Sequence, residues 1–294
     1  MTAADHASLP RLWVFNLDAE MELSRAGSYQ TTDAVLRALG SLEPRARALM
    51  QPGDRALGEA AQLPRREIGA CWSPTPSALR RLQKAGAELG PTPGESVLRR
   101  VCQRKFYYEL GGGAPGAVYV EDEHALSVLL ARLEPGDWLF KRAFSFAGRG
   151  QRRIQGQPST GDRRWLGDSL VRGGLLMEPW LHIEGELCLH GFIDLRGQLQ
   201  LGQACVQWTD ARRAWLRTAR AATGDLDSSE RTALARSAEA AARALWAAGY
   251  WGPFGIDAYR FRSASGARGF NPLGELNARY TMGFAAGFSP VPRL

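Results

Sequence analysis

Lysine and asparagine are scarce in this 294-residue chain. Only three of its 37 basic residues are lysine, and asparagine also occurs three times. These residues are Lys84, Lys105 and Lys141, and Asn16, Asn271 and Asn277. A lysine ammonium is a compact, mobile charge, whereas an arginine guanidinium is planar and rigid. We therefore expect each lysine to mark a place where a point charge has a specific use.

Long apolar runs and clustered cysteines are also missing. No run of about 18 apolar residues occurs, so we expect no membrane-spanning segment and no membrane partner. The first residues lack a basic segment followed by an apolar one, and we expect a cytoplasmic protein. The four cysteines show no C-x-x-C spacing. This spacing predicts buried thiols in a reducing compartment rather than disulfides or a zinc site.

The net charge of +7 raises the question of nucleic-acid binding. The basic residues are scattered, and their only clusters are pairs such as Arg65–Arg66. No basic helix, zinc finger or aromatic ribonucleoprotein motif accompanies them. We therefore expect no nucleic-acid partner, while a general attraction for anionic ligands stays open.

Strand and helix patterns alternate through about the first 95 residues, which indicates a small α/β unit. The expected elements are strands at 11–17 and 68–72 and helices at 31–40 and 74–86. The segment 88–96 is rich in proline and glycine and is the best candidate boundary. We predict an N-terminal α/β domain over 1–97 and a second domain over 98–294.

The second domain mixes helices with antiparallel strands, so the whole chain combines α/β and α+β architecture. Helices are expected at 96–112, 122–133 and 227–249, and strands at 116–120, 137–144, 254–261 and 274–280. An antiparallel meander is expected over 174–208, with its turn at 194–198. In the last helix Asp227 and Glu230 can close the first turn, and its apolar stripe comprises Leu234, Ala238, Ala241 and Leu245.

The segment GELNARYTMG, 274–283, has polar residues at every second position. In a strand, Glu275, Asn277 and Arg279 would share one face. A half-exposed strand with a polar outer face would show the same pattern. However, Asp257 lies in the middle of the neighbouring apolar strand, where a carboxylate is costly to bury without a partner.

If these two strands are adjacent, Asp257, Glu275 and Asn277 form a cluster of oxygen ligands. Such ligands suit a hard cation such as Mg²⁺. Arg279 would lie further along the same face, where it could stabilise a phosphoryl group. The alternative is a structural ion pair between Asp257 and Arg279, which leaves Glu275 and Asn277 unexplained.

Two other segments contain candidate nucleotide contacts. In KRAFSFAGRG, 141–150, Lys141 precedes a glycine-containing loop whose amides could approach phosphate oxygens, although a surface hairpin is the alternative. No P-loop motif occurs. In LLMEPWLHIEGE, 175–186, two acids flank a proline-containing strand exit, which fits a nucleotide hinge as well as a plain strand.

Together these segments resemble the ATP-grasp family, and their order along residues 100–283 is that of the family. The motif ELNAR is similar to the family's E-x-N-x-R signature. The resemblance implies nucleotide lysines Lys105 and Lys141; a phosphate-covering loop with Ser145, Gly148 and Gly150; an adenine hinge at Glu178, Trp180 and Leu181; a ribose carboxylate at Glu186; and metal ligands Asp257, Glu275 and Asn277.

The resemblance implies an ATP-grasp fold with an N-terminal pre-ATP-grasp domain over 1–97. The lid would occupy about 98–180 and the C-terminal subdomain about 181–294. It further implies ATP and Mg²⁺ as cofactors, with two ions bound and Mn²⁺ as an alternative. The implied reaction joins a small-molecule carboxylate to an amine through an acyl phosphate, with Lys141 and Arg279 as catalytic residues and amino acids or short peptides as default substrates.

Several alternatives stay open. A small-molecule kinase or a non-catalytic, regulatory nucleotide-binding protein could use the same cradle. Glu184 competes with Glu186 for the ribose, and Arg104 competes with Lys105 for the phosphates. The role of Asn16, Asp18 and Glu20, near the end of the first strand, is undetermined, as is a homodimeric state. His190, in the middle of a strand, is interpreted as structural.

Overall fold

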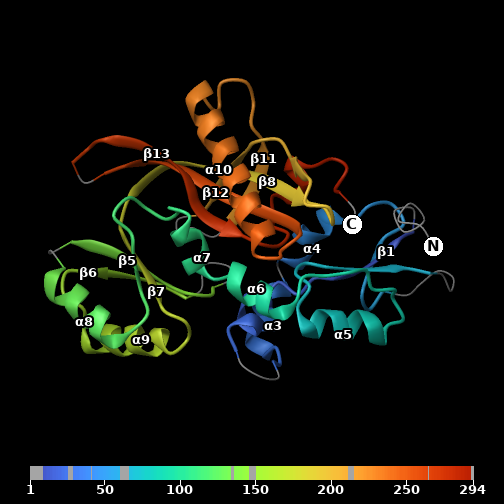
Figure 1. The fold of residues 1–294 in the computed structure, drawn as a ribbon, viewed down its shortest axis with the longest axis horizontal. Coiled ribbons are helices and arrows are strands. Elements are labelled where there is room, and N and C mark those ends of the chain that lie inside the picture. Colours follow the sequence, from blue (N-terminus) through green and yellow to red (C-terminus); the bar gives the residue numbers. More distant parts are fainter. Residues whose placement is uncertain are drawn as a thin grey trace.

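Three β-sheets organise the chain in the computed structural model (Figure 1). The structure describes residues 9–25, 29–40, 42–59, 66–133, 136–145, 150–210, 215–263 and 265–292, without the side chains of 34, 36 and 38. Within these residues, none of the helices has both the length and the apolar character needed to cross a bilayer.

The N-terminal sheet is parallel, with the order β2-β1-β3. Its strands are β1 (Arg11–Val14), β2 (Arg55–Ala56) and β3 (Ile68–Cys71). All four residues of β1 are buried, because helices cover both faces of this strand. Leu12 and Val14 pack against α5 (Pro76–Lys84), whereas Trp13 packs on the opposite side with Leu49. The short helices are α2 (Ala19–Leu23), α3 (Asp33–Gly40), α4 (Glu43–Ala46) and the 3₁₀ helix η1 (Arg47–Leu49).

The middle sheet is antiparallel, with the order β4-β7-β5-β6. Its strands are β4 (Val118–Val120), β5 (Asp137–Arg142), β6 (Gln151–Gln155) and β7 (Leu175–Pro179). Helices α8 (Glu123–Arg132) and α9 (Thr160–Leu170) cover one face (Figure 1) and pack on Phe140 and Met177. Since strand residues alternate between faces, the neighbours Lys141 and Glu178 point to the other face.

The third sheet is the largest, with the order β11-β10-β8-β12-β13 and β9 paired to β8. Its strands are β8 (His182–Ile193), β9 (Leu199–Leu201), β10 (Cys205–Thr209), β11 (Trp215–Arg220), β12 (Gly252–Arg262) and β13 (Arg268–Asn277). Helix α10 (Ser228–Ala247) covers one face, where Leu234 and Leu245 pack with Leu189 and Ile256. The opposite face carries the polar residues of the strands.

Most of the expected elements are present. The capping box of Asp227 and Glu230 begins α10, and the turn at 194–198 is closed by a hydrogen bond from Asp194 N to Gln198 O of 3.0 Å. The expected helix 96–112 is instead two helices, α6 (Glu95–Val101) and α7 (Arg104–Glu109), because Gln103 has an extended backbone with ψ of 143°.

Elements β2, β6, β11 and α9 were not predicted, because they are short or largely polar. The last short helix, α11 (Phe284–Gly287), follows the polar motif and packs its Phe284 against His190 of β8. The division at residue 97, and that of the second domain into lid and C-terminal parts, stays a prediction.

The packing of α10 on the large sheet generates a stability prediction. Leu245 is fully buried, so Leu245→Ala should lower the free energy of unfolding by about 2–5 kcal/mol through lost burial and a new cavity. Denaturation in urea, followed by circular dichroism, measures this change. Arg243→Ala, at an exposed position of the same helix, is the matched control and should change it by less than about 0.5 kcal/mol. Equal effects of the two substitutions would contradict the assigned packing.

Candidate active site

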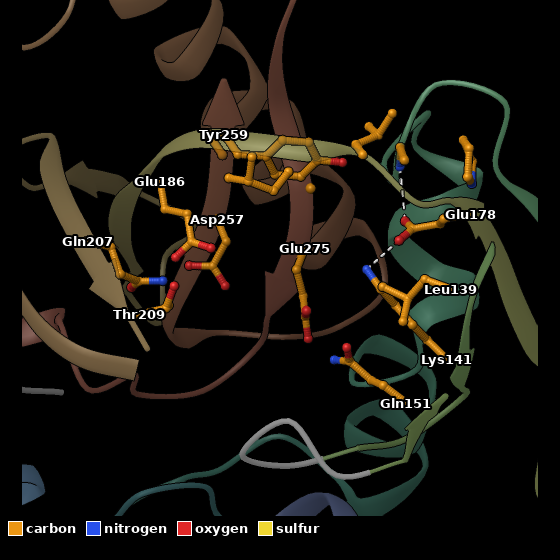
Figure 2. Close-up of a pocket in the computed structure, with 16 residues that line it drawn as sticks. Leu139, Lys141, Gln151, Glu178, Glu186, Gln207, Thr209, Asp257, Tyr259 and Glu275 are labelled. Atoms are coloured by element: carbon orange, nitrogen blue, oxygen red, sulfur yellow. Dashed lines mark hydrogen bonds and ion pairs between the residues drawn. The ribbon is translucent and has the colours of Figure 1, made fainter. Parts of the chain in front are cut away.

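A cleft of about 170 Å³ lies between the middle sheet and the large sheet (Figure 2). Polar side chains from both sheets converge on it: Lys141, Gln151, Glu178, Glu186, Gln207, Thr209, Asp257 and Glu275. One wall comes from β5, β6 and β7, and the other from β8, β10, β12 and β13. The two walls are distant in sequence, so the cleft is a product of the tertiary fold.

The register of β12 and β13 brings the acidic residues together. Asp257 lies directly opposite Glu275, so the two side chains share one face. Asn277 Nδ2 donates a hydrogen bond of 3.1 Å to Asp257 Oδ2. Glu186 points into the same space in Figure 2. The predicted adjacency of the two strands is confirmed, and it places the three predicted metal ligands in one cluster.

The two central carboxylates differ in their electrostatic environment. Burial raises the pKa of Asp257 to about 7, and the negative charges of Glu275 and Glu186 add to this effect. Burial alone would also raise the pKa of Glu275, but the positive charges of Arg104 and Lys141 bring it below its usual value. Asp257 therefore lies where a bound cation would compensate an excess of negative charge.

Lys141 is held on the opposite wall by Glu178. Its Nζ lies 2.5 Å from Glu178 Oε2, and both side chains are almost completely buried. The other oxygen of Glu178 accepts a hydrogen bond of 2.9 Å from the Ala114 amide, and Figure 2 shows both contacts at the edge of the cleft. The acid at the strand exit thus orients the lysine.

Part of the predicted hinge lines the cleft. Leu181 is buried and lines the cleft. The Trp180 amide instead donates a hydrogen bond of 2.8 Å to Asp137 O, and the Trp180 ring stacks under Arg153 at 4.1 Å. The Trp180 amide is therefore occupied by the middle sheet and does not face an adenine.

Arg104, rather than Lys105, faces the acidic cluster. Arg104 is buried, with Nη1 3.0 Å from Glu275 Oε1, and it also contacts Ser145. Lys105 is about one-third exposed, with Nζ 2.7 Å from Glu121. Adjacent residues of a helix point in directions about 100° apart, so only one of the pair can enter the cleft. The structure thus places Lys105 away from the predicted phosphate site.

The predicted phosphate loop joins two adjacent antiparallel strands. Gly150 has a φ of +78°, and its carbonyl accepts a hydrogen bond of 2.9 Å from the Arg142 amide. Gln151, the next residue, points into the cleft (Figure 2). Gly148 lies outside the described residues. The hairpin and the phosphate-loop interpretations are therefore compatible, since this hairpin adjoins the cleft.

Arg279 lies beyond the end of β13, where the alternation of the strand no longer holds. Its guanidinium pairs with Glu20 of α2 and lies 5.5 Å from the Trp72 ring. The alternative ion pair with Asp257 is not formed, and the charge of Arg279 only partly offsets the rise in the pKa of Asp257 that burial causes. Arg279 thus links the end of β13 to α2, close to the end of β3.

The three N-terminal polar candidates have different surroundings. Asn16 donates a hydrogen bond of 2.8 Å to Ser73 O, and Asp18 accepts one of 2.7 Å from Thr31, so both stabilise local structure. Glu20 instead pairs with Arg279.

The register of β8 separates the two ribose candidates. It shifts between Arg260 and Phe261 of the paired strand, next to Glu184. Glu184 therefore leaves the cleft face and pairs with Arg262 at 2.6 Å, while Glu186 lines the cleft. Gln207 and Thr209 also line the cleft but were not among the predicted site residues, although their alternation along β10 was a usable signal.

Solved structures with a similar fold include the biotin carboxylase–β-γ-ATP complex from Campylobacter jejuni. It has a TM-score of 0.55 and 14% identity, over 97% of this chain and 67% of that one. Carboxyaminoimidazole ribonucleotide synthase from Aspergillus clavatus, complexed with ATP, has a TM-score of 0.51 and 12% identity over 93% and 71%. The corresponding synthetase from Thermus thermophilus has a TM-score of 0.51 and 17% identity over 93% and 72%.

The chain spans between 54% and 72% of the length of the carboxyaminoimidazole ribonucleotide synthetases that it matches. No protein-family model matches the sequence, and no curated protein matches it. The likeness is therefore one of fold, and it extends over nearly all of the chain. These neighbours are ATP-grasp enzymes, and the chain has the ATP-grasp fold that the order of its motifs predicted.

Proposed function

We propose that the protein is an ATP-dependent ligase that activates a carboxylate as an acyl phosphate and transfers the acyl group to an amine. The observation that carries the proposal is the cleft itself, where the cluster of Asp257, Glu275 and Asn277 faces Lys141 across two sheets. Solved neighbours of the same fold were crystallised with ATP or ADP, which supports a nucleotide in this cleft.

The oxygen cluster fits Mg²⁺. Asp257 and Glu275 supply hard carboxylate ligands, and the raised pKa of Asp257 reflects a local excess of negative charge that a divalent cation would relieve. Bound Mg²⁺ would neutralise negative charge on the phosphate oxygens while the bond from the γ-phosphorus to the ADP oxygen breaks. Asn277 orients the Asp257 carboxylate through its amide, so the cluster is ordered before the ion arrives.

The remaining residues bind and orient the nucleotide. Arg104 and Lys141 contact the phosphates, Leu181 reads the adenine with its backbone, and Glu186 accepts hydrogen bonds from the ribose. In this assignment Arg104 takes the place of Lys105, because its guanidinium is buried next to Glu275. No side-chain nucleophile is needed, since the substrate carboxylate attacks the γ-phosphorus and ADP leaves. The amine then attacks the acyl carbon, and inorganic phosphate leaves.

A second cavity supports a substrate with an apolar group. It has a volume of about 110 Å³ and lies between β3 and the segment 250–253. Trp72 and Tyr280 line it together with Arg279. We assign Arg279 to the substrate carboxylate or its acyl phosphate, and the cavity to the apolar part of an amino acid or short peptide.

ADP release from the full chain tests the function. We expect Mg·ATP turnover to be stimulated by a carboxylate together with an amine, with apolar amino acids among the most effective. Glu275→Gln should reduce this turnover by at least about 100-fold, because it replaces a carboxylate ligand of the proposed Mg²⁺ with a neutral amide. Glu184→Gln, on the same sheet but outside the cleft, is the matched control and should retain activity.

Other outcomes would redirect the assignment. Stimulation by a single hydroxyl or carboxylate compound, with a phosphorylated product, would identify a kinase. Mg-dependent ATP binding in calorimetry without any turnover would favour a regulatory binder. A protein that does not bind ATP would overturn the proposal.

Arg104 and Lys105 can be distinguished by paired substitutions. Arg104→Ala should lower kcat/KM for ATP by about 100-fold or more, because a buried charge next to the phosphates is lost. Lys105→Ala should lower it by less than about threefold, since an exposed ion pair contributes little. Arg104→Lys keeps the positive charge, so it separates the loss of that charge from misfolding as the cause of a defect in Arg104→Ala. Thermal melting checks the fold of each variant. A larger defect in Lys105→Ala would reverse the assignment.

The pKa of Asp257 predicts a pH dependence for Mg²⁺ binding. Near and below pH 7 the carboxylate holds a proton, which the cation must displace. Affinity for Mg²⁺ should therefore rise by about tenfold per pH unit up to about pH 7 and then level off. Calorimetry in two buffers with different ionisation enthalpies counts the released proton. In Asp257→Asn this release should disappear, and its persistence would assign it to another group.

A further inference from the structure

A second group of potential ligands lies on the same face of the large sheet, next to the acidic cluster but made of other residues. Cys188, His190 and Cys205 are all buried, and one ligand atom from each lies within 4.8 Å of the others. The absence of a C-x-x-C motif did not reveal this group, because that motif depends on spacing along the chain. Strand register assembles it instead: Cys188 lies directly opposite Cys205, and His190 is two residues further along the same face.

The imidazole of His190 has an unused nitrogen. Its Nδ1 is buried and forms no hydrogen bond with a nitrogen or oxygen atom of any described residue, and the Cys205 thiol lies on the same side. The residue is only 2% exposed, so water does not solvate this nitrogen well. A buried polar atom without a partner costs free energy, which a ligand at this position would recover.

Two glycines pack closely against the imidazole, where a larger residue would crowd the ring. A Cβ atom at Gly287 of α11 would lie 3.0 Å from His190 Nδ1 and 3.7 Å from Cys205 Sγ. Both atoms therefore face the same glycine. On the other side, a Cβ atom at Gly255 would lie 3.0 Å from His190 Cδ2. The ring is thus oriented with Nδ1 towards the thiol of Cys205.

We propose that Cys188, His190 and Cys205 form a binding site for a thiophilic transition-metal ion, with Zn²⁺ as the natural occupant. Two thiolates and an imidazole are ligands that Zn²⁺ prefers, whereas Mg²⁺ prefers the oxygen cluster. Zinc–sulfur bonds of about 2.3 Å place tetrahedral ligand atoms roughly 3.5–3.8 Å apart. The three ligand atoms, which lie within 4.8 Å of one another, would therefore have to move about 1 Å closer together. Rotation of the thiol side chains can supply this movement.

The surroundings suit such an ion. Contact between the two thiols lowers the pKa of Cys205 and raises that of Cys188, so a bound ion would displace the remaining proton from Cys188. Two thiolates neutralise a divalent ion, so its binding adds little net charge beside Asp257, which lies opposite Cys188 on the neighbouring strand β12. The ion would tie β8 to β10 beside the nucleotide cleft. This inference does not depend on the proposed ligase activity.

Cobalt provides a direct test. The reduced, metal-stripped full chain is titrated with Co²⁺ in excess Mg²⁺, which saturates the oxygen cluster. We expect one equivalent to give a sulfur-to-cobalt charge-transfer band that Zn²⁺ abolishes. Cys205→Ser and His190→Gln should weaken Co²⁺ binding by more than about tenfold. Cys71→Ser is the matched control, since Cys71 lies on β3 outside the group, and it should retain the band.

The alternatives give distinct results. Absence of the band in the wild-type chain, or its persistence in both Cys188→Ser and Cys205→Ser, would overturn the proposal. A Cys188–Cys205 disulfide in the protein as purified, detected by mass spectrometry before reduction, would also overturn it. Circular dichroism checks that each variant is folded, and Co²⁺ that protects wild type but not Cys205→Ser from thermal unfolding would support the site independently.

Discussion

The pairing of β12 with β13 is the constraint on which the candidate site depends. Because Asp257 lies opposite Glu275, two carboxylates are forced onto one face and cannot avoid each other. Asn277 and Arg104 then compensate them from two sides, through a hydrogen bond and an ion pair. A slip of one residue in this register would turn the acids into the apolar layer beneath α10. The core therefore enforces the geometry of the cleft.

The polar face and the apolar face of the large sheet have complementary roles. Leu189 and Ile256 alternate with the polar residues and pack with α10, so the strands that carry the ligands are held by a continuous core. The opposing wall is built in the same way, with Phe140 in a core and Lys141 in the cleft. Each wall is thus rigid by itself, and the cleft lies where the two polar faces meet.

Much of this arrangement could be predicted from the sequence, because alternation and capping are local signals. The polar motif, the adjacent strands and helix α10 follow directly from such patterns. The choice between Arg104 and Lys105 could not, since it depends on how α7 is rotated against the large sheet. The partner of Arg279 was equally inaccessible, because Glu20 is 259 residues away and the strand ends before Arg279.

The buried pair of Lys141 and Glu178 has a consequence for selectivity. Without a ligand the lysine is already neutralised by a carboxylate at 2.5 Å, so the cleft does not present an uncompensated cation to passing anions. An incoming group must compete with Glu178 for the ammonium. A weak monoanion gains too little from this exchange, whereas a polyphosphate, with several charges distributed along its length, can share the lysine and engage Arg104 at the same time. In the proposed enzyme, this ion pair would therefore favour the binding of multivalent anions over monovalent ones.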